Sequence, residues 1–119
     1  MSEINEQLFL KDILEAVHRI QSYMDGVDYD QFQKDTKTQD AVLRNVEIIG
    51  EAAKQLSETV RQQAPQIPWR NIARMRDKLI HHYFGVNLDV VWHVTQNDLP
   101  ALMTAVEAML IAGETKDSQ

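Results

Sequence analysis

A regular spacing of apolar residues in the middle of the chain constrains the fold more than any other feature. The apolar side chains follow one another at steps of four, three, four, three and four residues, at Val42, Val46, Ile49, Ala53, Leu56 and Val60. This spacing places one buried stripe along an α-helix and is typical of helices in bundles. It predicts a long helix over residues 38–63, and Gly50 inside that helix indicates that another backbone comes close.

The flanking segments also carry helical signals. Apolar residues at three- or four-residue steps predict a first helix over about residues 5–25, with Gly26 as its C-terminal stop. Residues 27–37 are expected to form a linker with a short helical turn. Pro68 suits the first turn of a third long helix, which should stop near Gly85.

The C-terminal third predicts one short and one long helix. Residues 88–95 could form the short helix, and Asn97 or Asp98 can cap a final helix that ends at Gly113. The chain carries no strong strand signal. The expected fold is therefore all-α, an antiparallel four-helix bundle with one or two extra short helices.

Length and composition favour a single soluble domain. At 119 residues and 44% hydrophobic, the chain can bury one core, and we expect one domain over residues 1–113 and a disordered tail over 114–119. The absence of cysteine excludes disulfides and thiolate metal sites. The sequence has no signal-peptide pattern and no apolar run of membrane-spanning length, so we expect a cytoplasmic protein without a membrane role.

The charges are distributed unevenly. The net charge of −6 argues against broad adhesion to nucleic acid, and no DNA partner is expected. Residues 70–83 nevertheless have a local charge of +3, because they hold four basic residues and one acidic residue. This segment predicts a focused anion site, in which Arg70, Arg74 and Lys78 would bind phosphate or RNA.

The same segment contains an Arg-x4-His-x-Tyr motif formed by Arg76, His81 and Tyr83. On a straight helix, Arg76 and His81 would lie about 140° apart. They could meet if the helix distorts near Gly85 or if two subunits form a shared cleft. Asp77 precedes His81 by four residues, so its carboxylate can fix the imidazole tautomer and favour the charged ring.

Structural explanations compete with the catalytic one. Asp77 and His81 could belong to a solvated helix face, and Tyr83 could be a packed aromatic. A metal site is possible but not expected, because the chain has no His-x3-His pair. The residues that could supply ligands are His81, His82, Asp89 and His93. No phosphate-cradling glycine loop and no serine nucleophile elbow are present.

An arginine beside a histidine best suits the cleavage of RNA by its own 2′-hydroxyl group. The histidine would move the proton, and the arginine would stabilise the negative charge that builds on the phosphoryl oxygens. The product would end in a 2′,3′-cyclic phosphate. This reaction requires no cofactor.

The motif resembles the signature of HEPN-domain ribonucleases, in which a polar residue follows the arginine, as Asp77 does here. With Pro65, Pro68 and Trp69 upstream and the segment 48–53, the chain resembles the HepT toxin family over its whole length. The resemblance implies a HEPN-like fold and a homodimeric, metal-independent endoribonuclease toxin of a prokaryotic toxin-antitoxin pair. Its catalytic residues would be Arg76 and His81, supported by Asp77 and Tyr83, in a cleft at the dimer interface.

The resemblance also implies a partner and a modification. The partner would be a nucleotidyltransferase antitoxin that transfers AMP to Tyr83, and this AMPylation would make the toxin a phosphoprotein. A phosphate ester beside Arg76 would compete with RNA for the anion site. Asp77 stands where the family often has Asn. This difference could alter the pKa of His81 and hence the activity. The alternative is a non-catalytic helical partner of a nucleotidyltransferase that helps to bind its nucleotide.

Overall fold

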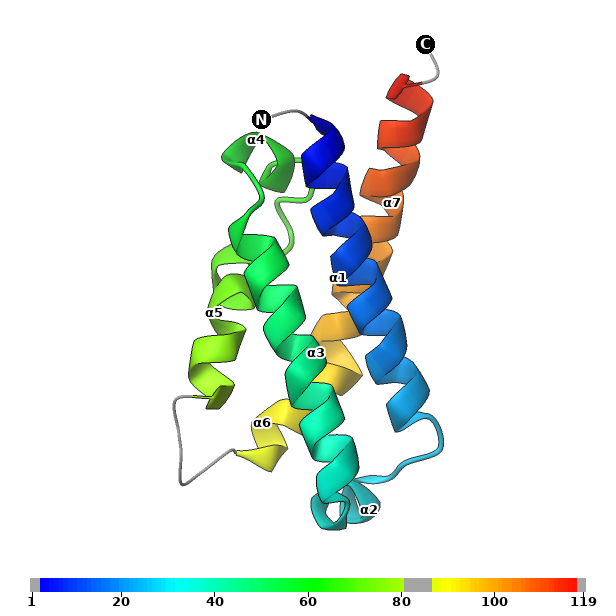
Figure 1. The fold of residues 1–119 in the computed structure, drawn as a ribbon, viewed down its shortest axis with the longest axis vertical. Coiled ribbons are helices and arrows are strands. Elements are labelled where there is room, and N and C mark those ends of the chain that lie inside the picture. Colours follow the sequence, from blue (N-terminus) through cyan, green and yellow to red (C-terminus); the bar gives the residue numbers. More distant parts are fainter. Residues whose placement is uncertain (1–2, 81–86, 118–119) are drawn as a thin grey trace.

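The computed structural model describes residues 3–80 and 87–117, and all regular structure in these ranges is helical (Figure 1). The elements in chain order are α1 (Glu3–Met24), α2 (Tyr29–Lys34), α3 (Thr36–Lys54), α4 (Glu58–Arg61), α5 (Trp69–Ile80), α6 (Leu88–His93), the π-helix η1 (Val94–Asp98) and α7 (Leu99–Asp117). The predicted all-α class is confirmed for this part of the chain. No helix within it is both long enough and apolar enough to cross a membrane.

Helix α1 packs against both α3 and α7, and α3 also packs against α5 (Figure 1). The core lies between these helices. All six residues of the central apolar stripe are buried, and the innermost of them, such as Val42 and Ile49, have no exposed surface. The periodicity therefore identified the buried side of this segment correctly.

The predicted helix over residues 38–63 is wrong at its C-terminal end, because it is divided into α3 and α4. Ser57 has an extended backbone, and its hydroxyl accepts a hydrogen bond from the Val60 amide to cap α4. The Glu6 carboxylate on α1 accepts hydrogen bonds from the Ser57 amide at 2.6 Å and from its hydroxyl at 3.2 Å. These contacts favour a cap over a continued helix.

The junction between α1 and α3 agrees more closely with the sequence prediction. Gly26 has a φ angle of +72° and ends α1 in the left-handed conformation, as predicted. The linker contains one short helix, α2, which begins at an Asp28 capping box with Gln31. Asp35 then caps α3, and hydrogen bonds donated by the side chain and backbone of Thr38 lower the pKa of the Asp35 carboxyl.

Helix α5 begins directly after Pro68, in agreement with the sequence prediction. The Trp69 indole nitrogen donates to the carbonyl oxygens of Arg61 and Ala64, each at 3.0 Å, so the first residue of α5 is tied to α4 and the loop that follows it. The expected end of this helix near Gly85 lies outside the described residues.

The C-terminal helices differ most from the prediction. The short helix is present as α6, capped by the Asn87 side chain. Helices α6, η1 and α7 then follow without a break, so the predicted cap at Asn97 or Asp98 is wrong. The Leu99 amide donates to the Val94 carbonyl, five residues earlier. A wide turn accommodates Pro100, which has no amide hydrogen and whose ring would collide with a carbonyl in a regular α-helix.

Gly113 does not end α7, which continues to Asp117. Gly113 lies against the side-chain amide of Gln7 on α1, and a β-carbon at this position would require only that flexible side chain to shift. The predicted helix end at Gly113 is therefore wrong. The division into a domain over residues 1–113 and a tail over 114–119 stays a prediction.

Candidate functional site

Helix α5 separates its apolar and polar side chains onto two faces. Its buried face, which includes Ile72, Ala73 and Met75, belongs to the core, and α5 packs against α3. Its exposed face carries Arg70, Arg74 and Asp77. The amphipathic sequence thus presents this charged face to solvent.

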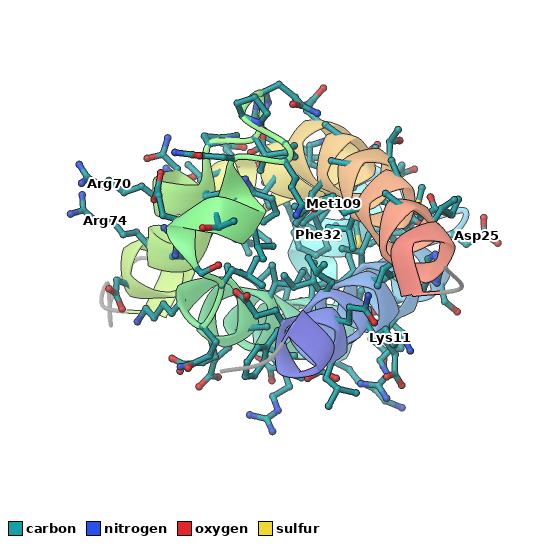
Figure 2. All side chains as sticks on the ribbon, turned by 90° about the horizontal axis from the view of Figure 1, so that it is seen from above. Lys11, Asp25, Phe32, Arg70, Arg74 and Met109 are labelled. Carbon is teal, nitrogen blue, oxygen red and sulfur yellow. The ribbon has the colours of Figure 1, made fainter. Side chains whose placement is uncertain are left out.

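Two arginines dominate the exposed face of α5. Arg70 and Arg74 are one helical turn apart, and in Figure 2 both side chains point away from the body of the molecule. Neither forms an ion pair with another described residue. Two unpaired guanidinium groups at this spacing can bind successive phosphates of a flexible polyanion. This position fits the predicted phosphate-binding role, which stays a prediction.

The rest of the motif is only partly described. Asp77 is exposed, and on a regular helix it lies about 20° from Arg70 around the axis. The backbones of Arg76 and Lys78 belong to α5, but their side chains lie outside the description. His81, His82 and Tyr83 lie outside the described residues altogether. The roles of Arg76, His81, Asp77 and Tyr83 therefore stay predictions.

Helix α6, the next described element after the motif, is anchored by aromatic residues. The Tyr29 hydroxyl on α2 donates to the Asp89 carboxylate. The Trp92 ring packs against Tyr29 and Phe32, with centroid distances of 5.5 and 5.9 Å. The sequence reading missed this anchor. An Asn before Leu88 could have indicated the cap, but no local signal links Tyr29 to a residue sixty positions away.

Two of the four candidate metal ligands, Asp89 and His93, have other contacts. Asp89 accepts from Tyr29, and a ring nitrogen of His93 lies 3.1 Å from the side-chain nitrogen of Asn97. Among the residues whose side chains the structure describes, no cluster of three or more potential ligands is suited to a metal ion. His81 and His82 lie outside these residues.

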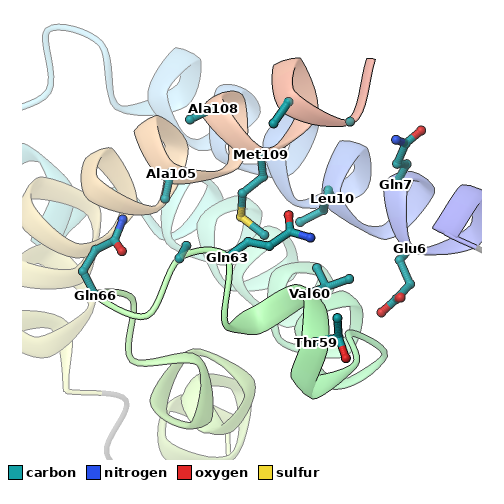
Figure 3. Close-up of a pocket in the computed structure, with 13 residues that line it drawn as sticks. Glu6, Gln7, Leu10, Thr59, Val60, Gln63, Gln66, Ala105, Ala108 and Met109 are labelled. Carbon is teal, nitrogen blue, oxygen red and sulfur yellow. The ribbon is translucent and has the colours of Figure 1, made fainter. Parts of the chain in front are cut away.

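A cavity of about 470 Å³ lies at another part of the molecule, between α1, α4 and α7 (Figure 3). Its lining combines alanine and other apolar side chains with glutamine amides and the Glu6 carboxylate. Sequence reasoning did not find it, because its residues come from three segments far apart in the chain.

Comparisons with known proteins show which class of protein has this fold and this basic helix. The family model for ribonuclease HepT-like proteins matches residues 13–109. "Putative RNase MJ0127" of Methanocaldococcus jannaschii is 42% identical over 120 residues, covering 99% of each chain. "Probable ribonuclease HepT" of Thermococcus cleftensis is 45% identical over 101 residues, covering 85% of this chain and 92% of the relative.

A third relative, "Putative RNase TTE0752" of Caldanaerobacter subterraneus, is 38% identical over 102 residues, covering 86% of this chain and 91% of its own. No solved structure gives a significant match. The chain is thus a ribonuclease by class. More specifically, it belongs to the HepT-like ribonuclease family, and its predicted activity as an endoribonuclease is supported by that membership.

Proposed function

We propose that this endoribonuclease is the toxin of a prokaryotic toxin-antitoxin pair, acts in the cytoplasm and cleaves RNA without a metal ion. The observation that carries the proposal is the family match, which spans residues 13–109 and therefore includes the whole motif. The exposed arginines of α5 support it, because Arg70 and Arg74 give an acidic protein a local surface for phosphates. Lys78 would extend this surface.

The proposed reaction uses the 2′-hydroxyl group of the RNA as the nucleophile. His81 moves a proton, and Arg76 stabilises the phosphoryl oxygens as their charge increases. The 2′-oxygen forms a bond to phosphorus, the bond from phosphorus to the 5′-oxygen breaks, and the leaving oxygen takes up a proton. The products are a 2′,3′-cyclic phosphate and a 5′-hydroxyl. Asp77 would orient His81, and Tyr83 would support the site.

Helix geometry favours a site shared by two subunits. A regular helix separates the positions of Arg76 and His81 by about 140°, so a second copy is the simplest way to bring such groups to one phosphate. We propose a homodimer of HEPN-like antiparallel four-helix bundles, each formed by α1, α3, α5 and α7. The packing of α1 on α3 and α7, and of α3 on α5, supports this arrangement.

Regulation would act on the same segment. The proposed antitoxin is a nucleotidyltransferase that transfers AMP to Tyr83 and releases pyrophosphate from ATP. The new phosphodiester would add negative charge and bulk close to Arg76, so RNA could no longer occupy the anion site.

The catalytic proposal is tested with purified protein and single-stranded RNA in EDTA. Arg76→Ala and His81→Ala should each reduce the cleavage rate roughly 100- to 10,000-fold. Arg19→Ala and His18→Ala, at exposed positions of α1, are matched controls and should leave the rate unchanged. Replacing the 2′-hydroxyl by hydrogen at the cleaved nucleotide should abolish cleavage. Equal activity of wild type and both motif variants would refute the mechanism.

The biological role is tested by expression with and without the proposed nucleotidyltransferase antitoxin. Expression alone should stop growth, and coexpression should restore growth while adding the mass of AMP to Tyr83. Tyr83→Phe should prevent the modification. If the protein neither cleaves RNA nor affects growth but forms a tight complex with the nucleotidyltransferase, the non-catalytic alternative is correct.

A further inference from the structure

The cavity between α1, α4 and α7 has the dimensions of a small-molecule site. Its volume of about 470 Å³ falls within the range of roughly 300–1,000 Å³ that is common for ligand pockets. In Figure 3, Val60 and Thr59 lie beside Glu6 toward one end, and Gln66 lies near Ala105 toward the other. Polar lining residues therefore occur at both of these places in the wall.

The walls of the cavity are mainly apolar. Leu10 of α1 and Met109 of α7 are buried core residues that reach the cavity (Figure 3). Alanines on α7, at positions 105, 108 and 112, leave space where larger side chains would fill it. An apolar chain placed along this wall would lose contact with water, which favours binding.

The Glu6 carboxylate is the most informative group in the lining. Its residue is only 9% exposed, yet its described hydrogen bonds come from neutral donors, the amide and hydroxyl of Ser57. No lysine, arginine or histidine forms an ion pair with it among the described residues. Buried carboxylates are normally paired with a positive charge, and each oxygen can accept further hydrogen bonds. Glu6 can therefore bind a cation from the cavity.

The other polar groups that the structure describes in the lining are uncharged. Gln7, Gln63 and Gln66 supply side-chain amides, and the described lining residues include no basic residue. An anion such as a nucleotide or an RNA phosphate would have to approach the buried Glu6 carboxylate without a compensating positive charge. The lining thus disfavours anions and favours an occupant with a positive end and an apolar body.

We propose that this cavity binds a small aliphatic amine, with its ammonium group at Glu6 and its hydrocarbon chain along the alanines and Met109. The site goes beyond the proposed ribonuclease function and uses none of its residues. Occupancy would connect α1, α4 and α7, so the bound protein should also unfold at a higher temperature.

The charge preference is tested with hexylamine, hexanol and hexanoate, which share a chain length and differ at the end group. Binding to the full-length protein is followed by NMR, through the side-chain amide signals of Gln7 and Gln63. Hexylamine should bind at least about tenfold more tightly than hexanol, and hexanoate should bind most weakly. Equal affinity for hexylamine and hexanoate would refute the proposal.

Two variants locate the site. Glu6→Gln should remove the preference for hexylamine over hexanol, whereas Asp40→Asn, which also neutralises a carboxylate but at an exposed position of α3, should preserve it. Ala108→Leu should weaken hexylamine binding by filling the cavity without altering Glu6, which keeps the test decisive if Glu6→Gln does not fold. Unchanged hexylamine binding in Ala108→Leu would place the ligand elsewhere. RNA cleavage is measured separately on the same samples. The amine-binding proposal can therefore fail while the ribonuclease proposal holds, and the reverse is also possible.

Discussion

The outward face of α5 and the cavity between α1, α4 and α7 have opposite chemistry, although the helices around both belong to one core. The first presents Arg70 and Arg74 to solvent. The second holds alanines, glutamine amides and a buried carboxylate. One surface is suited to a polyanion and the other to a cation. The net charge of −6 describes neither of them, because binding depends on the local arrangement of charge.

The difference originates in the two helices. Helix α5 alternates basic and apolar residues so that each type has its own face. Helix α7 carries a single charged residue, Glu107, between Leu99 and Gly113. Apart from Thr104 and Glu107, its exposed positions between Leu99 and Gly113 are alanines and Ile111, and the cavity lies beside two of these alanines.

The largest expected effect tests whether the two regions share an equally well-packed core. Ile72→Ala on α5 and Leu102→Ala on α7 should each lower the free energy of unfolding by about 2–5 kcal/mol. The wild-type side chains are 3% and 0% exposed. Urea unfolding provides the measurement. Leu8→Ala, at a position 53% exposed, is the control and should change stability by less than about 0.5 kcal/mol.

A smaller effect is expected where the two regions meet. Trp69 on α5 bonds to the carbonyls of Arg61 and Ala64, and Ala64 also lines the cavity. Trp69→Phe should lower the free energy of unfolding by about 1–3 kcal/mol, because both carbonyls lose their indole donor. Trp92→Phe controls for the smaller ring. If Trp69→Phe keeps wild-type stability, the hydrogen bonds of Trp69 do not contribute to the stability of the contact between the two regions.

The outer face of α5 should affect RNA binding more than stability. Reversing both charges, as Arg70→Glu with Arg74→Glu, should weaken RNA binding by about tenfold or more and reduce the salt dependence of log K by about 1.4. The same charge change at Lys11 and Lys37, exposed on α1 and α3, is the control. Binding is measured by fluorescence anisotropy with an uncleavable RNA at several salt concentrations. Equal losses in both variants would indicate a general charge effect.

The smallest effect concerns the cap of α3, the helix that contacts both α1 and α5. The pKa of Asp35 is lowered in the folded protein, chiefly by the Thr38 hydroxyl. Its stabilising contribution is therefore present above the ordinary pKa of aspartate and is lost as the pH falls through the folded value. Asp35→Ala should lower Tm slightly at pH 7, and the gap to wild type should narrow by about pH 3. A gap that widens in acid would contradict this sign.

Local signals predicted the long helices well. The stripe from Val42 to Val60 is buried as expected, and Gly26 and Pro68 mark real boundaries. The sequence failed where distant residues determine the backbone. Ser57 interrupts a periodic stripe because Glu6, fifty-one positions away, accepts its hydrogen bonds.

The candidate site also combines features that the local sequence predicts with features that depend on distant residues. The composition of α5 was enough to expect Arg70 and Arg74 on an exposed face. The α2–α6 anchor and the cavity required the tertiary structure, because Tyr29 meets Asp89 and Glu6 approaches α4 only in the folded chain. A single sequence does not specify such pairs.

The π-helical turn η1 separates two helical registers, one in α6 and one in α7. One extra residue within Val94–Asp98 is absorbed by the wide turn, so α6 and α7 keep independent registers within one unbroken run of helical residues. If apolar residues are counted at three- and four-residue steps across this turn, residues after it are therefore assigned to the wrong face of the helix. Removing one residue from the turn would bring both registers into a single α-helical repeat without rotating either face. The same deletion inside α7 would turn the rest of that helix by about 100° and expose its buried side.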